Sequence, residues 1–566
     1  MNLLILISAF LLILISLIGY GYIFVKLFCK ETIDINFGYL GVFGLIFSIF
    51  ISYSSNFFLP HNYFFNSIYL LVGLLGIIIL FKQNSLIHIK KEFLIFLTVS
   101  FVALLSLLIF KNHDDFSYYH FVYTYNLTQF DLNIGTGQFN HGFRTPSSIF
   151  YINSLFYLPF IKYHSFNFAA VIILIFSNII LLKKVGIIYS NNFFSFKKKI
   201  DNKNILVFFS LLSFIFINIF FYRIGEHGTD RSAQILVMLL IIEIIESFNR
   251  KSYDNFLNLK IFTLLIFIIS LKAFYILYLI LLLPLYLNYY KYFKSNFYLL
   301  KNLLSGYLIF YVLIFLLILS SYFFSTGCLL YPIEITCFDT LGWSIPGNQV
   351  EQMNQWYQQW SKAGAGPGFR VDDPQVYIEK FNWLSNWIDK YFFNKVSDFL
   401  FGIIFLSIVI IISFRKSNKS KTIFKIQKNY IFLYGIILIL FFEWFYNHPA
   451  LRYGGYNLIA IIIFLPISVY LSSKNIKFNN YKFTSSVLII LTVIIFSGRN
   501  MHRIYKEHVL YGYNPLIKPF YKVNESYFRE YTNLKNLIYD YNKCVQNNNC
   551  QEIKVKEKYG IYIFEN

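Results

Sequence analysis

The chain has 566 residues, of which 57% are hydrophobic and only 14% are charged, and its formal net charge is +21. A soluble protein usually carries about 25% charged residues, so this composition excludes an ordinary soluble enzyme. The lysines gather in alternate short loops, as the positive-inside rule requires, and this placement argues against nucleic-acid binding. We therefore expect an all-α polytopic membrane protein.

Apolar runs long enough to cross a bilayer recur from one end of the chain to the other. The first, MNLLILISAFLLILISLIGYGYIF, has neither the basic start nor the small-residue cleavage pattern of a signal peptide, so we expect a retained helix. The runs 259–272 and 274–289 could instead form one unit that is kinked around Lys272. Hydropathy and length together predict about 14 transmembrane helices. They are expected at residues 3–25, 38–58, 66–82, 93–110, 166–182, 205–222, 233–249, 259–272, 274–289, 298–322, 397–414, 430–446, 455–472 and 484–497.

Short basic loops alternate with these spans, and we place them in the cytoplasm. The opposite side then receives the N-terminus and five segments. The apolar segment 147–161 is too short to span, so we predict an interfacial or re-entrant helix there. The five outer segments are the loop 111–146, the turn RIGEHGTDRS at 223–232, the long loop 323–396, NHPALRYGG at 447–455 and the tail 498–566.

The chain divides into four parts on this topology. Residues 1–322 form a transmembrane core that carries the acidic outside loop 111–146, and residues 323–396 form a small extracytoplasmic helical module. Residues 397–497 hold the C-terminal transmembrane helices. Residues 498–566 form a short polar extracytoplasmic tail, in which CQEIKVKEKYGIYIF has a weak strand pattern.

Four of the five cysteines fall on the outer side, in two close pairs. Cys328 lies near Cys337, and Cys544 lies near Cys550. Close pairs of this kind suit two disulfides in an oxidising compartment, and their spacings are not those of metal sites. These four residues are therefore the disulfide candidates.

The long outer loop contains five of the six tryptophans of the chain. An amphipathic helix is predicted over 346–362, because Trp356 and Trp360 share one face with other apolar residues. The next helix starts at DDPQ, with Asp373 as N-cap and Pro374 at the first helical position. The linker AGAGPGF lacks the Lys-Ser/Thr of a phosphate-binding loop, so it is a link or lid. We expect these aromatic helices to lie on the membrane or cover a site, with stacking on a sugar as the alternative.

Two adjacent carboxylates, Asp114 and Asp115, appear where the fourth span ends, in IFKNHDDFSYYHFVYTYN. Asp115 could simply cap a helix that starts at Phe116. The neighbouring tyrosines could be interfacial belt residues. The other polar residues of this loop are His113, Tyr118, Tyr119, His120, His141 and Arg144.

Three further outer segments place ionisable groups at the ends of spans, where such groups are costly unless they are paired or functional. Asp230 could be the N-cap of the following span. Lys272 and Arg452 could extend toward lipid headgroups. The groups are Arg223, Glu226, His227, Asp230 and Arg231 in one turn, Lys272 between two apolar runs, and Glu443, His448 and Arg452 near the NHPALRYGG turn.

Carboxylates and bases from separate loops thus lie at one membrane face. This mixture suits a reaction between an anionic lipid phosphate and a hydroxyl acceptor. An anionic lipid phosphate needs Arg or Lys nearby, and Arg adds bidentate contacts. A hydroxyl acceptor needs a carboxylate base. A divalent ion such as Mg²⁺ or Mn²⁺ would take carboxylate oxygens, for which Asp114 and Asp115 are the candidates.

The chain resembles the GT-C superfamily of integral-membrane glycosyltransferases, which use polyprenyl-phosphate-linked sugars. HDDFSYY, FRTPSS, GTDR, CLLYPIEITCFDTLGWS and RYGGY are similar to a poorly characterised bacterial branch, and the likeness covers residues 93–460. Three helices precede the one that leads into the acidic loop, where many members have none. This departure puts the alignment of the later helices in doubt.

The resemblance implies that Asp114 or Asp115 acts as catalytic base or metal ligand. It also implies basic groups near the donor phosphate. The candidates for that role are Arg144, Arg231, Lys272 and Arg452, with His113, His120, Tyr118, Tyr119, Glu226, His227, Asp230 and His448 in support.

We therefore expect a glycosyltransferase that moves a sugar from a polyprenyl-phosphate-linked donor to a glycan, lipid or protein acceptor of the cell envelope. It would be a multi-pass protein of the bacterial inner membrane, in contact with membrane lipids, with its active side facing the periplasm. An envelope polysaccharide polymerase or ligase that depends on Arg and His is the alternative. A lipid-linked-glycan transporter fits less well, because transport sites lie near the bilayer midplane in repeated, broken helices.

Overall fold

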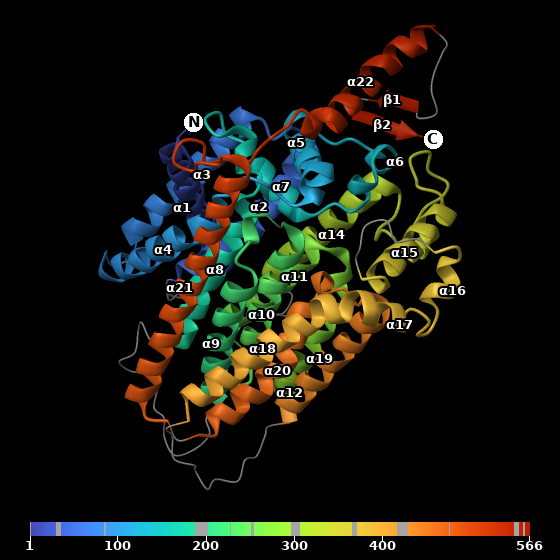
Figure 1. Cartoon of the computed structure of the whole chain (residues 1–566). Coiled ribbons are helices and arrows are strands. Elements are labelled where there is room, and N and C mark those ends of the chain that lie inside the picture. Colours follow the sequence, from blue (N-terminus) through green and yellow to red (C-terminus); the bar gives the residue numbers. More distant parts are fainter. Residues whose placement is uncertain are drawn as a thin grey trace.

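The structure is a computed structural model that describes residues 2–29, 36–83, 86–186, 202–226, 228–250, 254–295, 306–364, 371–415, 428–474, 476–547, 554–558 and 561–565. Across these ranges the regular structure is helical apart from one two-stranded hairpin. Figure 1 shows the long helices side by side, with the short helices α5, α6 and α7 and the hairpin at one end.

The first half of the chain forms long helices that are interrupted by a group of short ones. The α-helices are α1 (Leu3–Phe28), α2 (Phe37–Asn56), α3 (Tyr63–Gln83), α4 (Leu86–Leu107), α5 (Phe121–Gln129), α6 (Thr136–Phe139), α7 (Ser148–Leu155), α8 (Phe168–Val185), α9 (Asn202–Phe220), α10 (Thr229–Ser247) and α11 (Asn255–Leu271). Between them lie the π-helix η1 (Phe116–His120) and the 3₁₀ turns η2 (His141–Arg144), η3 (Lys162–Ser165) and η4 (Ile224–Glu226).

The second half adds long helices, a group of mostly shorter helices within residues 334–396 and the hairpin. The helices are η5 (Ala273–Leu281), α12 (Leu282–Ser295), α14 (Gly306–Thr326), η6 (Glu334–Thr336), α15 (Gly347–Lys362), α16 (Pro374–Ile378), α17 (Leu384–Trp387), η7 (Ile388–Val396), α18 (Ser397–Ser413), α19 (Lys428–Asn447), η8 (Leu451–Tyr453), α20 (Gly455–Ser472), α21 (Phe478–Tyr511) and α22 (Ser526–Asn547). The strands β1 (Lys554–Lys558) and β2 (Ile561–Glu565) pair antiparallel.

Every predicted span coincides with a helix or a helix pair, although the start of the run 298–322 lies outside the described residues. Nine described helical stretches are long and apolar enough to cross a membrane, and three shorter apolar ones have 10–17 residues. The helices α4 and α10 fall outside both sets, and each carries several charged side chains. The described chain is thus compatible with a multi-pass membrane protein.

Glycines allow the first three helices to pack closely. A Cβ on Gly21 of α1 would lie 1.7 Å from the carbonyl oxygen of Leu40, and one on Gly44 of α2 would lie 1.9 Å from that of Leu17. A Cβ on Gly19 would likewise meet the carbonyl oxygen of Gly73 in α3. Small residues let helices approach in this way within membranes. The contact fixes α1, α2 and α3 as one unit beside the buried helix α8.

The two runs on either side of Lys272 are separate helical elements and not one kinked unit, because Lys272 pairs with Asp230 at the start of α10 whereas Asn288 donates to the carbonyl of Ser247 at its end. Helix α11 ends at Leu271, Lys272 is extended, and the 3₁₀ helix η5 begins at Ala273. The apolar segment after the acidic loop forms only the eight-residue helix α7, whose residues are all buried. It is therefore a helix too short to span, as its length predicted.

The outer loop folds as its sequence predicted in most respects. Helix α15 covers 347–362, and Asp373 caps α16 by accepting hydrogen bonds from the backbone N–H groups of Gln375 and Val376. The disulfide Cys328–Cys337 is present. The linker AGAGPGF falls largely outside the described residues, and so does the pairing of Cys544 with Cys550.

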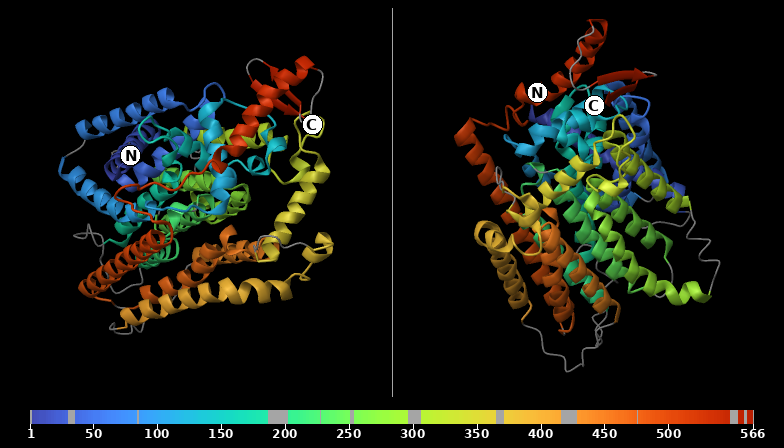
Figure 2. Two further views of the ribbon diagram at one scale, coloured as in Figure 1. Left: turned by 45° about the horizontal axis from the view of Figure 1, so that its top comes forward. Right: turned by 90° about the vertical axis from the view of Figure 1, so that its right-hand side faces the viewer.

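The C-terminal tail lies along the acidic loop, a role that its sequence did not reveal. Strand β2 pairs with Ile134, whose N–H donates to the carbonyl of Tyr562 and whose carbonyl accepts from the N–H of Phe564. Tyr521 packs edge-on against Phe116 and donates to the carbonyl of Tyr163. Figure 2 shows the tail (red) at the same end as the short helices after α4.

Candidate functional site

Four charged side chains from four separate segments form one ion cluster at the end of the helical bundle. Arg452 donates from Nη2 to Asp115 Oδ2 and from Nε to Asp230 Oδ2, at 2.9 Å in both cases. Lys272 Nζ pairs with the other oxygen of Asp230. The four groups therefore form the series Asp115–Arg452–Asp230–Lys272, whose formal charges sum to zero.

Local backbone geometry turns both carboxylates toward Arg452. Asp115 precedes the π-helix η1, but its side chain makes no capping hydrogen bond. Asp230 stands in the first turn of α10, where Gly228 is the N-cap. The capping alternatives for these two residues are therefore wrong, because the carboxylates point to a cation from another segment instead of to their own helix ends.

The segment that carries Arg452 is held by buried amide groups. Gln234 of α10 donates to the carbonyl oxygen of Arg452 at 2.9 Å and accepts from the backbone N–H of Asn457 at 3.2 Å. Gly454, which follows η8, has a φ of +109°, a conformation that favours glycine. The RYGGY stretch thereby forms a tight corner that directs Arg452 into the cluster.

Aromatic rings cover the cations of the cluster. The guanidinium carbon of Arg452 lies 5.3 Å from the ring centre of Trp360 and 5.6 Å from that of Tyr453. Lys272 Nζ lies 4.8 Å from the ring centre of Tyr453. Because Trp360 belongs to α15, the outer loop covers the site, as one of the sequence alternatives predicted.

The two adjacent acids have different environments. The side chain of Asp114 is 93% exposed, and its Oδ1 lies 3.9 Å from Lys111 Nζ. The side chain of Asp115 is 29% exposed. Burial opposes the ionisation of Asp115, but the charge and hydrogen bond of Arg452, with smaller contributions from His113 and His120, lower its pKa overall. Asp115 is therefore an ionised and already paired carboxylate.

His120 and His448, which lie near the cluster, favour the neutral form. Burial lowers the pKa of His120 to about 4 and that of His448 to about 4. His113 Nδ1 lies 3.4 Å from Asp115 Oδ2. Burial also raises the pKa of Tyr119, and the charge of Asp115 adds to this shift, so its phenol stays a hydrogen-bond donor. Tyr118 is 53% exposed.

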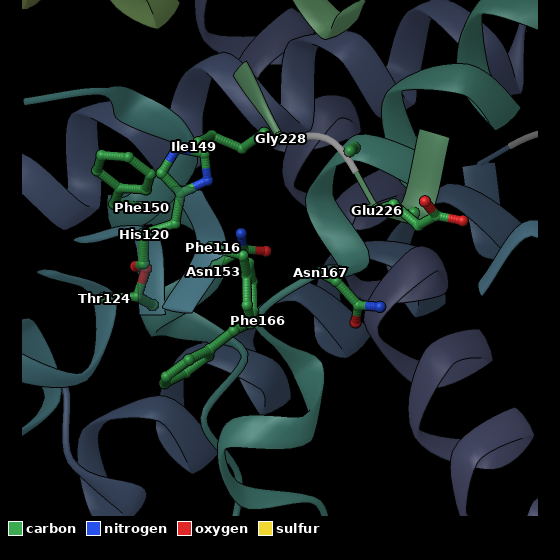
Figure 3. Close-up of a pocket in the computed structure, with 12 residues that line it drawn as sticks. Phe116, His120, Thr124, Ile149, Phe150, Asn153, Phe166, Asn167, Glu226 and Gly228 are labelled. Carbon is green, nitrogen blue, oxygen red and sulfur yellow. The ribbon is translucent and has the colours of Figure 1, made fainter. Parts of the chain in front are cut away.

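A small pocket lies beside η1, the helix that directly follows Asp115 of the cluster. Figure 3 shows its lining, in which His120 of η1 lies across from Glu226 and Asn167. His120 Nε2 and Asn167 Oδ1 are buried and have no hydrogen-bond partner within the described residues. The pocket is lined by Phe116, His120, Thr124, Ile149, Phe150, Asn153, Phe166, Asn167, Ala170, Gly225, Glu226 and Gly228.

Several predicted site residues lie in other contacts. Arg144 donates from Nε to the carbonyl of Gly137 at 2.8 Å and joins the outer loop at Tyr331. Arg231 faces the ring of Phe221. These contacts lie away from the ion cluster, so the role of both arginines at a donor phosphate stays a prediction.

The remaining predicted residues surround the cluster at greater distance. Glu226 is buried and pairs with Arg223 and, at 3.8 Å, with Arg503 of α21. His141 lies in η2, and Glu443 in α19 accepts from Asn447. His227 lies outside the described residues.

The Asp-Asp pair does not fit a divalent cation. The described residues contain no group of three or more His, Cys, Asp or Glu that could hold a metal ion. Asp114 points to solvent beside Lys111, while Asp115 is already neutralised by Arg452. A metal ion bound to Asp115 would have to displace the guanidinium of Arg452, so the two acids are not arranged as a metal site.

Sequence reasoning missed the residues that hold the cluster in place. Gln234, Tyr453 and Asn457 have no charge, and Gln234 and Asn457 stand directly between apolar or aromatic residues. The RYGGY stretch, in which two glycines follow Arg452, was the signal that could have marked a tight corner at a site.

Comparison with known proteins gives one match. A family described as a domain of unknown function (DUF8201) matches residues 2–460, which is most of the chain. No curated protein and no solved structure matches.

Proposed function

The chain belongs to the DUF8201 family, and we propose that it is a membrane glycosyltransferase that uses a polyprenyl-phosphate-linked sugar. The proposal rests on one observation, which is the ion cluster Asp115–Arg452–Asp230–Lys272 under Trp360. The cluster supplies both parts that the reaction needs. Arg452 and Lys272 can hold a phosphate, and Asp115 can take a proton from an acceptor hydroxyl.

The unliganded pairing explains how such a site would stay inactive without its donor. Arg452 uses Nε and Nη2 on the two carboxylates. A phosphate that binds Arg452 and Lys272 competes with Asp115 for the guanidinium. Asp115 then loses the partner that lowers its pKa, so it becomes a stronger base when the donor is in place.

The reaction follows from these positions. Asp115 accepts the proton of the acceptor hydroxyl while that oxygen forms a bond to the sugar C1. The bond between C1 and the phosphate oxygen breaks, and its electron pair leaves with the lipid phosphate. Arg452 and Lys272 stabilise the negative charge that develops there. A single displacement of this kind inverts the anomeric centre.

The same proposal extends to topology and location. The chain crosses the bacterial inner membrane about 14 times in a GT-C-like arrangement. Its cluster and outer loop face the periplasm, where the acceptor is a glycan, lipid or protein of the envelope. The support is that Trp360, which covers Arg452, belongs to the same 323–396 loop as the disulfide Cys328–Cys337, since disulfides persist in oxidising compartments.

The test is sugar transfer from polyprenyl-phosphate-linked donors in membranes that contain the wild type, Asp115→Asn or Asp114→Asn at matched protein levels. Asp115→Asn removes the base and should reduce transfer by about 10²-fold or more. Asp114→Asn is a matched control, because the carboxylate of Asp114 neighbours Asp115 in sequence but is 93% exposed and outside the cluster.

Two outcomes would contradict the proposal. Equal transfer by the wild type and Asp115→Asn would mean that this carboxylate does not act as the base. Retained activity in Asp115→Asn together with loss in Arg452→Ala would favour the polymerase or ligase alternative, in which arginine leads the chemistry.

A further inference from the structure

The small pocket beside η1 contains two buried polar atoms that have no partner. His120 Nε2 and Asn167 Oδ1 make no hydrogen bond within the described residues, and Asn167 is only 7% exposed. Both side chains line the pocket, and Figure 3 shows them across from each other. The pocket has room for about one water molecule. Since buried polar atoms nearly always have hydrogen-bond partners, water is the ligand that this space fits.

A single water molecule can satisfy both atoms. A protonated imidazole nitrogen donates a hydrogen bond, whereas an amide oxygen only accepts one. Water between them would therefore accept from His120 Nε2 and donate to Asn167 Oδ1. The neutral imidazole carries one proton, so Nδ1 of His120 is then the nitrogen that can accept another.

The π-helix η1 brings this imidazole to the base of the proposed reaction. The N–H of Phe121 donates to the carbonyl of Phe116, five positions earlier, where an α-helix would use the fourth. Residues five positions apart, such as Asp115 and His120, therefore lie one turn apart on one face. Burial has the largest effect on the pKa of His120, and among the charged groups Asp115 has the largest. His120 thus adjoins both the carboxylate and the pocket.

His113 is the other histidine beside Asp115, but its nearer nitrogen is already in use. His113 Nδ1 lies 3.4 Å from Asp115 Oδ2 and accepts a hydrogen bond from the backbone N–H of Asp115 at 3.2 Å. A proton on this nitrogen would break that hydrogen bond. His120 is therefore better placed to take a proton from Asp115.

The pocket also leads toward solvent. Its wall opposite His120 includes Glu226, a buried carboxylate that accepts from Arg223 Nε at 2.8 Å. The side chain of Arg223 is 46% exposed. The four residues of the ion cluster all lie in the described chain, and none of them lines the pocket. A proton that reaches the pocket water therefore has a route that is separate from the phosphate-binding cations.

We propose that His120 and a water molecule held by Asn167 carry the proton away from Asp115 after each transfer. Protonated Asp115 gives its proton to His120 Nδ1, while Nε2 releases its own proton to the water and from there to solvent. The imidazole is neutral before and after this step, and exchange with water restores its first tautomer. The inference rests on the proposed function, because it needs Asp115 as the base. His120 touches no substrate and acts only through Asp115.

The experiment is chemical rescue of sugar transfer in membranes that contain the full chain. His120→Ala removes the imidazole and leaves room for a free one. Transfer should fall by about tenfold or more, and added imidazole should restore most of it. Pyrrole is the matched control, because this ring has the same size but is not a base. It should restore nothing, although it refills the same space.

Two further variants complete the set. The amide of His120→Gln can hydrogen-bond but cannot relay a proton, so this variant should lose transfer and should not respond to imidazole. His502→Ala, at an exposed position of α21, should leave transfer unchanged. Thermal unfolding of each purified variant shows whether it is folded. If His120→Ala does not fold, His120→Gln decides, since full transfer by a folded glutamine variant overturns the relay.

Two other results would also overturn the relay. Equal rescue by pyrrole would mean that His120 only fills space. Rescue of His113→Ala by imidazole, without rescue of His120→Ala, would mean that the proton leaves through His113. In both cases loss of transfer in Asp115→Asn would keep the proposed function. If the wild type transfers no sugar, the proposed function fails, and the relay fails with it.

Discussion

Arg452 Nη2 lies 2.9 Å from Asp115 Oδ2, although 337 positions separate the two residues in the chain. The pair joins the first outer loop to the corner before α20, and Asp230 completes it from α10. Both side chains are about a third exposed, so solvent screens the pair and its net contribution to stability is modest. Its value lies in fixing where the guanidinium and the carboxylate stand relative to each other.

A double-mutant cycle should detect this coupling. Asp115→Asn and Arg452→Gln should each lower the free energy of unfolding, and the double variant should cost less than the sum by about 1 kcal/mol. Thermal or denaturant unfolding in detergent supplies the measurement. The same cycle with Asp114→Asn in place of Asp115→Asn should give additive effects, because Asp114 does not contact Arg452. Equal coupling in both cycles would contradict the pairing.

The ionised state of Asp115 should make the wild type sensitive to acid. Its pKa is lower in the folded protein than in the unfolded chain, mainly because the effect of Arg452 exceeds that of burial. The stabilisation is therefore complete above the usual carboxyl pKa of about 4 and is lost as the pH falls through the lower folded value. The stability difference between the wild type and Asp115→Asn should shrink over that range. A difference that stays constant down to about pH 3 would argue against a lowered pKa.

His448 should add a second acid-sensitive contribution at higher pH. Burial lowers its pKa from 6.5 to about 4, so the unfolded chain takes up a proton that the folded protein does not. Stability should therefore fall as the pH drops from 6.5 toward 4. The variant His448→Gln should reduce this slope in a series of thermal unfolding curves, and His502→Gln, at an exposed position, should leave it unchanged. No change of slope in His448→Gln would mean that the imidazole is not held neutral.

The tail contacts should contribute to the stability of the acidic loop. Tyr521 is 4% exposed, packs against Phe116 and donates to the carbonyl of Tyr163. Tyr521→Ala should cost about 3 kcal/mol, as expected for the loss of a large buried ring, and should reduce sugar transfer because Phe116 directly follows Asp115. Tyr505→Ala on α21, at a position that is 64% exposed, is the control for both readouts. Equal effects of the two variants would show that the tail does not support the loop.

The sequence predicted the helices well because hydropathy acts locally. A run of apolar residues specifies a helix whatever it packs against, so the positions of the spans could be read directly. The caps of the outer loop were equally local, as Asp373 shows by bonding to residues two and three positions ahead. These predictions needed only neighbours in the chain.

The site was predicted only in part because its contacts are distant in sequence. Asp115, Asp230, Lys272 and Arg452 were all candidates, but charge alone could not separate them from Arg144 and Arg231. The choice between Asp114 and Asp115 depended on the start of the π-helix η1, which turns one carboxylate inward and leaves the other in solvent. No local pattern marks that start.

The pairing of β2 with Ile134 has a consequence for the order of biosynthesis. A ribosome makes the acidic loop early and the hairpin much later, because most of the chain lies between them. Until residues 561–565 emerge, Ile134 lacks a partner for its N–H and its carbonyl, and Phe116 lacks the ring of Tyr521. The loop would thus reach its final shape only after synthesis of the tail. A chain that stops early could form its long helices and would still lack these contacts beside the acidic loop.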